Sequence, residues 1–363
     1  MSRQWLIREY RESDEEPIRK LFELVFNNPS SAERWAWQYR SNPAGHGIIV
    51  LAETAQSIVG QYALIPLTMK IKNTVCLGSL SLDTMVHPDY RGQGMFIALA
   101  QKAYEIAAER GVHFVYGFPN ENSHYGINKR LGWSDLHTGI PLWIKPLNIE
   151  SIIKNRLVDN DLVARLGDKF GKLGMKILNN TYTWSYDSRT ICEIREMDRF
   201  DQRFDTLWQN ASANYNIAVV RDRLYLTWRF ADKPNESYVI LIAESGKRLL
   251  GYTVLKCIRR FGLQIGIIVD MVIRSEESNA GIALISAAIK YFELRQQDIV
   301  GCLMLPRSIY SHYLRQNGFI VAPRWFLPQK MYLGVHNFST QFADSYIVQP
   351  RNWLITWGDH DVL

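Results

Sequence analysis

The chain of 363 residues contains the same series of landmarks twice. Residues 34–62 align without a gap with residues 225–253, so that Trp37 lies opposite Trp228. The other recurring landmarks are Ile7-Arg8-Glu9 with Ile194-Arg195-Glu196, Asp83 with Asp270, Gly94 with Gly281, Pro119 with Pro306, and Gly132-Trp133 with Gly318-Phe319. A near-constant shift over separate elements indicates a duplicated domain rather than a solenoid. The length also favours two domains of ordinary size.

Each copy shows the same order of expected elements. Apolar periodicity in the first copy predicts two helices before the central strands and one long helix after them. The expected strands are 5–8, 48–53, 58–64, 80–86 and 112–116, and the expected helices are 17–26, 34–40 and about 95–110. We expect domains at 1–145 and 191–340, with a helical connector at 146–190 and a tail at 341–363. The connector's apolar spacing favours packing between the domains, with a membrane-surface helix as the alternative. In the tail, Trp353, Ile355 and Trp357 predict one face of an additional strand.

One turn in the first copy is suited to a pyrophosphate. An apolar run ends at His87-Pro88, and Arg91, Gly92 and Gly94 precede an apolar segment with helical spacing. Glycines allow backbone N–H groups to converge on one anion, and a helix N-terminus adds a partial positive charge. The P-loop pattern Gly-x-x-x-x-Gly-Lys-Ser/Thr is absent. The dinucleotide pattern Gly-x-Gly-x-x-Gly is incomplete.

The run Val-His-Pro-Asp-Tyr-Arg-Gly-Gln-Gly at residues 86–94 resembles the acyl-CoA pyrophosphate loop of the GNAT (GCN5-related N-acetyltransferase) superfamily. The family pattern is Arg-x-x-Gly-x-Gly/Ala, and Phe96 departs from its last position. The resemblance implies an α+β fold with two tandem GNAT-like domains. Each would be a twisted mixed sheet flanked by helices, with two splayed central strands that admit the pantetheine arm.

The resemblance also implies residues that bind acetyl-CoA or another short acyl-CoA, with no metal. The expected donor-binding residues are Met85, Val86, Arg91, Gly92, Gln93, Gly94, Met95, Phe96, Asn120 and Asn122. A strand N–H near Met85 or Val86 would polarise the thioester carbonyl. In the second copy Ser278 stands in place of Arg91, and two glutamates precede it. We therefore expect acyl-CoA to bind to the first copy alone. The second copy should act as a partner that forms part of the wall of the acceptor site.

Candidate catalytic groups lie on both sides of this loop. Asp83 is the nearest carboxylate for a general base, although its match to Asp270 also fits a structural role. The family's usual acid is the tyrosine of Tyr-x-x-x-Gly-Phe, and here Asn128 occupies that position. Tyr125 and His124 lie about one helical turn earlier and are alternative proton donors. Catalysis by proximity alone stays open.

The two-copy layout resembles bacterial sugar N-acyltransferases that modify nucleotide-linked amino sugars for surface polysaccharides. The alternatives are an aminoacyl-tRNA-dependent cell-wall peptide transferase, an N-acetyltransferase for another small amine or peptide, and a non-catalytic acyl-CoA sensor. The net charge of +6 suits an acidic small molecule, and without a Lys/Arg block we expect no nucleic-acid partner.

The compartment is predicted from cysteine use and from the absence of targeting segments. The four cysteines show neither a CxxC pair nor metal-ligand spacing, which is typical of a reducing compartment. The N-terminus lacks a signal-peptide core, and no apolar run approaches a membrane span. We therefore expect a cytoplasmic protein without stable membrane insertion. The sequence leaves the oligomeric state open.

Overall fold

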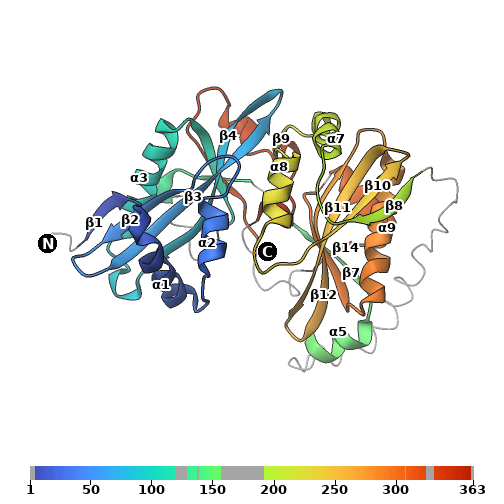
Figure 1. Cartoon of the computed structure of the whole chain (residues 1–363), viewed down its shortest axis with the longest axis horizontal. Helices are drawn as coiled ribbons and strands as arrows, with labels where there is room; N and C mark the ends of the chain where they lie inside the picture. The colour runs from blue at the N-terminus through green and yellow to red at the C-terminus, as the bar shows by residue number, and fades with distance from the viewer. Residues whose placement is uncertain are drawn as a thin grey trace.

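The computed structural model describes residues 5–119, 129–136, 139–156, 192–306, 308–323 and 331–360. It contains two mixed β-sheets that lie side by side (Figure 1). The first sheet runs β1 (Leu6–Glu9), β2 (Ile48–Glu53), β3 (Ile58–Ile71), β4 (Thr74–Val86), β5 (Val112–Gly117), β15 (Gly334–Asn337) and β6 (Ser134–Asp135), with β9 (Ile217–Val219) beside β3. The second sheet runs β14 (Ile320–Val321), β7 (Leu142–Pro146), β13 (Ile299–Leu303), β12 (Leu263–Ile273), β11 (Arg248–Arg260), β10 (Val239–Ser245) and β8 (Glu193–Met197).

Helices cover both sheets, and α5 of the first half of the chain lies against β12 of the second sheet. In the first half they are α1 (Glu15–Phe26), α2 (Ala32–Tyr39), α3 (Met95–Glu109) and α5 (Ile149–Arg156). In the second half they are α7 (Arg203–Ala211), α8 (Arg223–Leu226), η4 (Thr227–Ala231), α9 (Ser278–Leu294), α10 (Ile309–Gln316) and α11 (Asp344–Ile347). The short 3₁₀ turns are η1 (Glu12–Asp14), η2 (Pro88–Tyr90), η3 (Ser212–Asn214), η6 (Pro350–Asn352) and η7 (Trp357–Asp359). The architecture confirms the predicted α+β fold of two sheets flanked by helices.

The two halves exchange one strand each. β7, from the first half of the chain, pairs with β13 and β14 in the second sheet. In return β15, from the second half, pairs with β5 and β6 in the first sheet. β15 lies between β5 and β6 in the first sheet, and β7 lies between β13 and β14 in the second sheet. The two exchanged strands therefore occupy equivalent positions in the two sheets. The exchange ties the two halves together through backbone hydrogen bonds as well as through side-chain packing.

A pair of tryptophans related by the repeat marks the centre of the contact between the halves. The Trp37 indole N–H donates to the Trp228 carbonyl at 2.6 Å, and the Trp228 indole N–H donates to the Trp37 carbonyl at 2.9 Å. Their rings stack with centroids 5.1 Å apart. This reciprocal geometry is what a local two-fold axis between duplicated halves produces.

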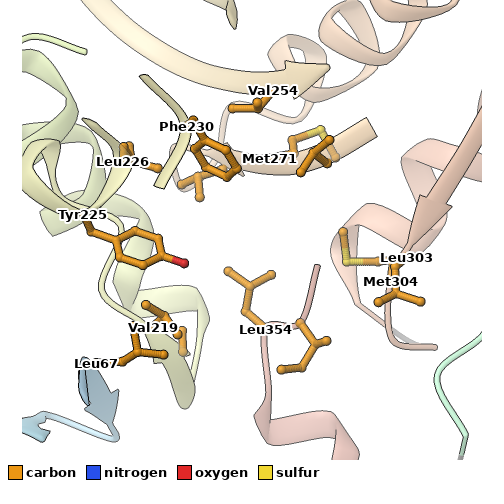
Figure 2. Close-up of a cluster of buried hydrophobic side chains, with 14 of the residues drawn as sticks. Leu67, Val219, Tyr225, Leu226, Phe230, Val254, Met271, Leu303, Met304 and Leu354 are labelled. Atoms are coloured by element: carbon orange, nitrogen blue, oxygen red, sulfur yellow. The ribbon is translucent and has the colours of Figure 1, made fainter. Parts of the chain in front are cut away.

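One apolar core runs through both halves beside this pair. Figure 2 shows Leu67 of β3 together with Met271 of β12, Leu303 of β13 and Leu354 of the tail. The tail was expected as a strand, but it forms α11 and the turns η6 and η7, with a single β-bridge between Trp353 and Ile217. Trp353, Leu354 and Ile355 are all buried, which uses successive side chains rather than alternate ones and suits an irregular segment between two sheets.

The expected strands of the first half are close to those observed, with two extensions. β3 continues to Ile71, beyond the expected end at residue 64, and β4 begins at Thr74, before the expected start at residue 80. The β3–β4 hairpin is therefore longer than predicted. No helix in the described ranges has the length and apolar character that a bilayer crossing requires.

Candidate active site

The glycine turn of residues 91–94 leads directly into α3. Gly92 and Gly94 have φ values of +75° and +77°, the left-handed region that favours glycine, and Gly94 caps the helix. The helix begins with a hydrogen bond from the Ala98 N–H to the Gly94 carbonyl. Among the described residues, the backbone N–H groups of residues 92–97 donate to no backbone or side-chain oxygen. The turn and the first helical turn therefore present several amides to one anionic ligand.

The side chains around this turn leave the backbone approachable. Arg91 is exposed, and its Nε donates to the Val86 carbonyl at 3.3 Å. The Gln93 side chain accepts from the Trp5 indole. The Phe96 ring turns inward and meets the Tyr62 ring edge-on at 6.1 Å. The bulky residue at this position therefore packs against the sheet and does not cover the N-terminus of α3.

Strands β4 and β5 separate next to the turn. Their parallel pairing ends at Ser81 and Gly117, whereas β4 continues to Val86 with β3 as its partner. Along residues 82–86, the edge of β4 that faces away from β3 has no strand beside it in the described chain. This is the predicted splay of the central strands. Met85 is fully buried and half-buried Val86 ends the strand, so both lie along the open part of β4.

Asp83 occupies a β-bulge in this open part. The β3–β4 register shifts between Gln61 and Ala63, and Asp83 has a φ of +46°, a region that aspartate tolerates better than most residues. Its carboxylate accepts from the Gln38 amide at 2.6 Å and from the Tyr39 hydroxyl at 2.8 Å. The Gln61 amide donates to the Asp83 carbonyl. The α2 helix thus fixes the carboxylate that the sequence singled out.

The same carboxylate lines a narrow recess between α1, α2 and the sheet. Arg19 and Arg34 also line this recess. Arg19 is tied to the Ser30 carbonyl and to Glu15. One carboxylate residue and two arginines therefore line a recess on the side of the sheet opposite α3. Such a set can accept a proton from one part of a ligand and hold an anionic group of another part.

The equivalent position in the second half is closed. Asp270 is 1% exposed and accepts from the Arg221 guanidinium, the Tyr252 hydroxyl and the Thr356 hydroxyl. Arg221 also donates to Asp359 at 2.7 Å. The C-terminal tail therefore supplies two of the groups that enclose Asp270.

Burial sets the ionisation of this cluster. It raises the pKa of the Asp359 carboxyl above its ordinary value, although Arg221 acts in the opposite direction. For Arg221, burial is outweighed by Asp270 and Asp359, which hold its pKa well above the usual range. The cluster is a structural ion network. Asp83, in contrast, is half-buried and lines the narrow recess between α1 and α2.

Sequence patterns alone did not identify a buried chain of hydroxyl groups beside the splay. The chain consists of Ser81, Tyr62 and Tyr104, with the Trp133 indole at its far end. Burial raises the pKa of Tyr62 to about 12 and also raises that of Tyr104, so both hydroxyls stay protonated near neutral pH. The sequence did contain one signal for this chain: Tyr62 and Tyr104 lie within the apolar runs of a strand and a helix. A tyrosine buried in such a run requires a hydrogen-bond partner for its hydroxyl.

Several predicted residues cannot be placed. Tyr125, His124, Asn120, Asn122 and Asn128 lie outside the described residues. The predicted residues that the structure brings together are Asp83, Met85, Val86 and the turn from Arg91 to Phe96. Asp83, Met85 and Val86 lie along the open part of β4, and the turn from Arg91 to Phe96 follows its C-terminal end.

Comparison with known proteins agrees with this geometry. Residues 6–135 match the family model of the acetyltransferase (GNAT) domain. No curated protein sequence matches the chain. A crystal structure from Enterococcus faecalis V583, described as a probable N-acyltransferase, has a TM-score of 0.63 at 13% identity and covers 92% of this chain and 72% of its own.

Two further solved structures share the fold. A GCN5-related N-acetyltransferase from Anabaena variabilis has a TM-score of 0.63 at 13% identity, over 91% of this chain and 72% of its own. Saccharomyces cerevisiae N-myristoyltransferase with bound myristoyl-CoA has a TM-score of 0.58 at 10% identity, over 93% of this chain and 80% of its own. At these identities the likeness concerns the fold. Residues 6–135 thus resemble a GNAT acetyltransferase domain by the matched family model, and the solved structures show that the fold extends over most of the chain.

Proposed function

We propose that the protein is an acyl-CoA-dependent N-acyltransferase in which the amine attacks the thioester directly. The observation that carries this proposal is the juxtaposition of the amides of residues 92–97 with the open edge of β4. The turn would hold the pyrophosphate with Arg91, and the pantetheine arm would lie along residues 82–86. Solved relatives with this fold include an enzyme with bound myristoyl-CoA, which supports an acyl-CoA as the donor.

The acceptor amine would enter from the recess on the α1–α2 side. There Asp83 is the carboxylate nearest the splay, and it would remove a proton from the attacking amine. Arg34 lines the same recess and suits an acceptor with a phosphate or diphosphate. We therefore propose a nucleotide-linked amino sugar of surface polysaccharide synthesis as the acceptor, with acetyl or a short hydroxyacyl group transferred.

The second half would serve as a partner rather than as a second donor site. Ser278 replaces the arginine of the turn there, and Glu277 directly precedes α9. A carboxylate at a helix N-terminus would repel a pyrophosphate. Asp270, the counterpart of Asp83, is enclosed by Arg221 and the tail. We propose that one acyl-CoA binds per chain.

A thiol-release assay tests the proposal. Wild-type protein with acetyl-CoA is offered UDP- and dTDP-linked amino sugars, polyamines, short peptides and aminoacyl-tRNA in parallel. Release of CoA with an amino-sugar nucleotide, and its loss when the amino group is replaced by a hydroxyl, supports the proposal. Release of CoA with another amine refutes the acceptor. Transfer of a labelled amino acid from aminoacyl-tRNA, which releases tRNA and no CoA, refutes acyl-CoA as the donor. Binding of acetyl-CoA without turnover of any amine refutes the enzyme and favours a sensor.

A further inference from the structure

Two almost fully buried side chains at the narrow recess lined by Asp83 each leave one polar atom without a hydrogen-bond partner among the described residues. These atoms are the indole nitrogen of Trp35, on α2, and the amide oxygen of Gln61, on β3. Trp35 is 4% exposed and Gln61 is 1% exposed, and both residues line the recess. Because a buried polar group without a partner is costly, a ligand group in this recess would gain affinity by supplying the missing bonds.

The surroundings of both side chains hold them in place. The Gln61 amide nitrogen donates to the Asp83 carbonyl at 3.0 Å, and turning the amide over would bring its oxygen against a second acceptor. The Trp35 ring packs with the rings of Tyr10 and Tyr39, at centroid distances of 5.4 and 5.3 Å. The recess is therefore lined by one positioned donor and one positioned acceptor that the protein itself does not use.

The second half of the chain shows that the fold does not require this pair. In the gap-free alignment of residues 34–62 with residues 225–253, Leu226 stands opposite Trp35 and Tyr252 stands opposite Gln61. Leu226 has no polar side-chain atom, and the Tyr252 hydroxyl donates to the Asp270 carboxylate at 2.6 Å. Neither position therefore leaves a polar atom unpartnered in the second half. The unused donor and acceptor belong to the half that carries the intact turn, which favours a role in ligand binding.

The missing bonds define the chemistry of the group that fits. It must accept from the indole N–H and donate to the amide oxygen. A hydroxyl does both, whereas an ammonium group has no lone pair for the indole and a carboxylate has no proton for the amide. A neutral amine that accepted from the indole would use the lone pair that it needs for attack on the thioester. The recess leaves about 10 Å³ to the centre of a water-sized group, so it admits one hydroxyl rather than a whole sugar ring.

We propose that Trp35 and Gln61 form a hydroxyl-binding subsite for the acceptor, which therefore carries a hydroxyl on the carbon next to its amine-bearing carbon. The inference rests on the proposed function, in which the amine lies beside Asp83. Asp83 lines the same narrow recess, so a hydroxyl bound there keeps an amine on the neighbouring carbon close to the carboxylate. Amino sugars contain this arrangement and simple polyamines do not. Trp35 and Gln61 set specificity and take no part in proton transfer.

Matched acceptors test the subsite. The amine with the highest kcat/KM in the thiol-release assay is compared with counterparts in which hydrogen replaces, in turn, each hydroxyl next to the amine. For one of these deoxy acceptors, kcat/KM of the wild type should fall roughly 100-fold or more, because the analogue leaves the donor and acceptor of the subsite unpaired. Values within about threefold of each other for all acceptors would mean that the recess holds a water molecule alone. That result refutes the subsite and leaves the acyltransferase activity standing.

Two variants assign the effect to the named residues. Trp35→Phe removes the indole N–H and keeps a ring, so kcat/KM should fall roughly 10- to 100-fold with the hydroxyl acceptor and at least about fivefold less with the deoxy acceptor. Gln61→Met should narrow the same ratio, whereas Trp208→Phe, in α7, should leave it unchanged. Equal losses with both acceptors in folded Trp35→Phe and Gln61→Met would show a structural role and refute the subsite.

The identity of the best acceptor gives an independent check. A best acceptor without a hydroxyl next to its amine, such as a simple polyamine, refutes the subsite even though CoA is released. Release of no CoA with any amine refutes the proposed function instead, and this inference with it.

Discussion

The stacked pair of Trp37 and Trp228 makes a quantitative prediction about the duplicated architecture. Each indole donates to the other's backbone carbonyl, and each side chain is less than 10% exposed. Replacing either residue by leucine removes one hydrogen bond, leaves one buried carbonyl without its donor, and removes part of a buried ring. These changes should cost about 1–3 kcal/mol for the orphaned carbonyl and about 1–2 kcal/mol for the lost packing. Each single variant should therefore lose about 2–5 kcal/mol of unfolding free energy.

The two-fold relation adds a second requirement. The two variants should cost nearly the same, and the double variant should cost about 0.5–1.5 kcal/mol less than their sum, since the stacking contact can be lost only once. Urea unfolding followed by far-ultraviolet circular dichroism measures all three values. Trp208→Leu is the matched control, because Trp208 is equally buried but lies in α7, stacked on Tyr215. Unequal single costs, or a Trp37–Trp228 coupling no larger than that between Trp37→Leu and Trp208→Leu in their double variant, would refute the symmetric contact.

Three further predictions concern charge, base and packing. Burial lowers the pKa of Lys233 to about 6, so between about pH 6 and 10 the unfolded chain holds a proton that the folded chain lacks. Stability should therefore rise with pH by up to about 1.4 kcal/mol per unit, and urea unfolding at pH 7, 8 and 9 should show a smaller slope in Lys233→Met. In Asp83→Asn, kcat should fall by roughly 10²–10⁴ with little change in KM for acetyl-CoA; steady-state kinetics would contradict the base assignment if kcat stayed within about threefold. A Cβ on Gly60 would lie 2.5 Å from the Met95 sulfur, so Gly60→Ala should cost about 1–3 kcal/mol in thermal unfolding and weaken acetyl-CoA binding, whereas Gly301→Ala, with no atom closer than 3.7 Å, should do neither.

The local features of the donor site could be predicted because they depend on short-range chemistry. Gly92 and Gly94 form the expected turn, with left-handed φ values that favour glycine, and α3 begins at Met95 as expected. The splay between β4 and β5 followed from the resemblance, and the end of pairing at Ser81 confirms it.

Features that depend on distant parts of the chain could not be predicted in the same way. The exchange of β7 and β15 changes which sheet a strand joins without changing its local pattern, so apolar periodicity carries no signal for it. The tail has the alternating bulky residues of a strand but fills the space between two sheets, where successive side chains are buried. The face on which Asp83 lies depends on a bulge, and a single extra residue reverses the alternation.

The number of acetyl-CoA molecules bound by one chain tests the central claim most directly. Isothermal titration calorimetry of wild-type protein should give one site per chain. Arg91→Ala should weaken that site by roughly 10-fold or more, because a charge-assisted hydrogen bond to phosphate contributes about 1.5–3 kcal/mol. A stoichiometry of two, or a single site whose affinity is the same in Arg91→Ala, would contradict a donor site built from the turn of the first half.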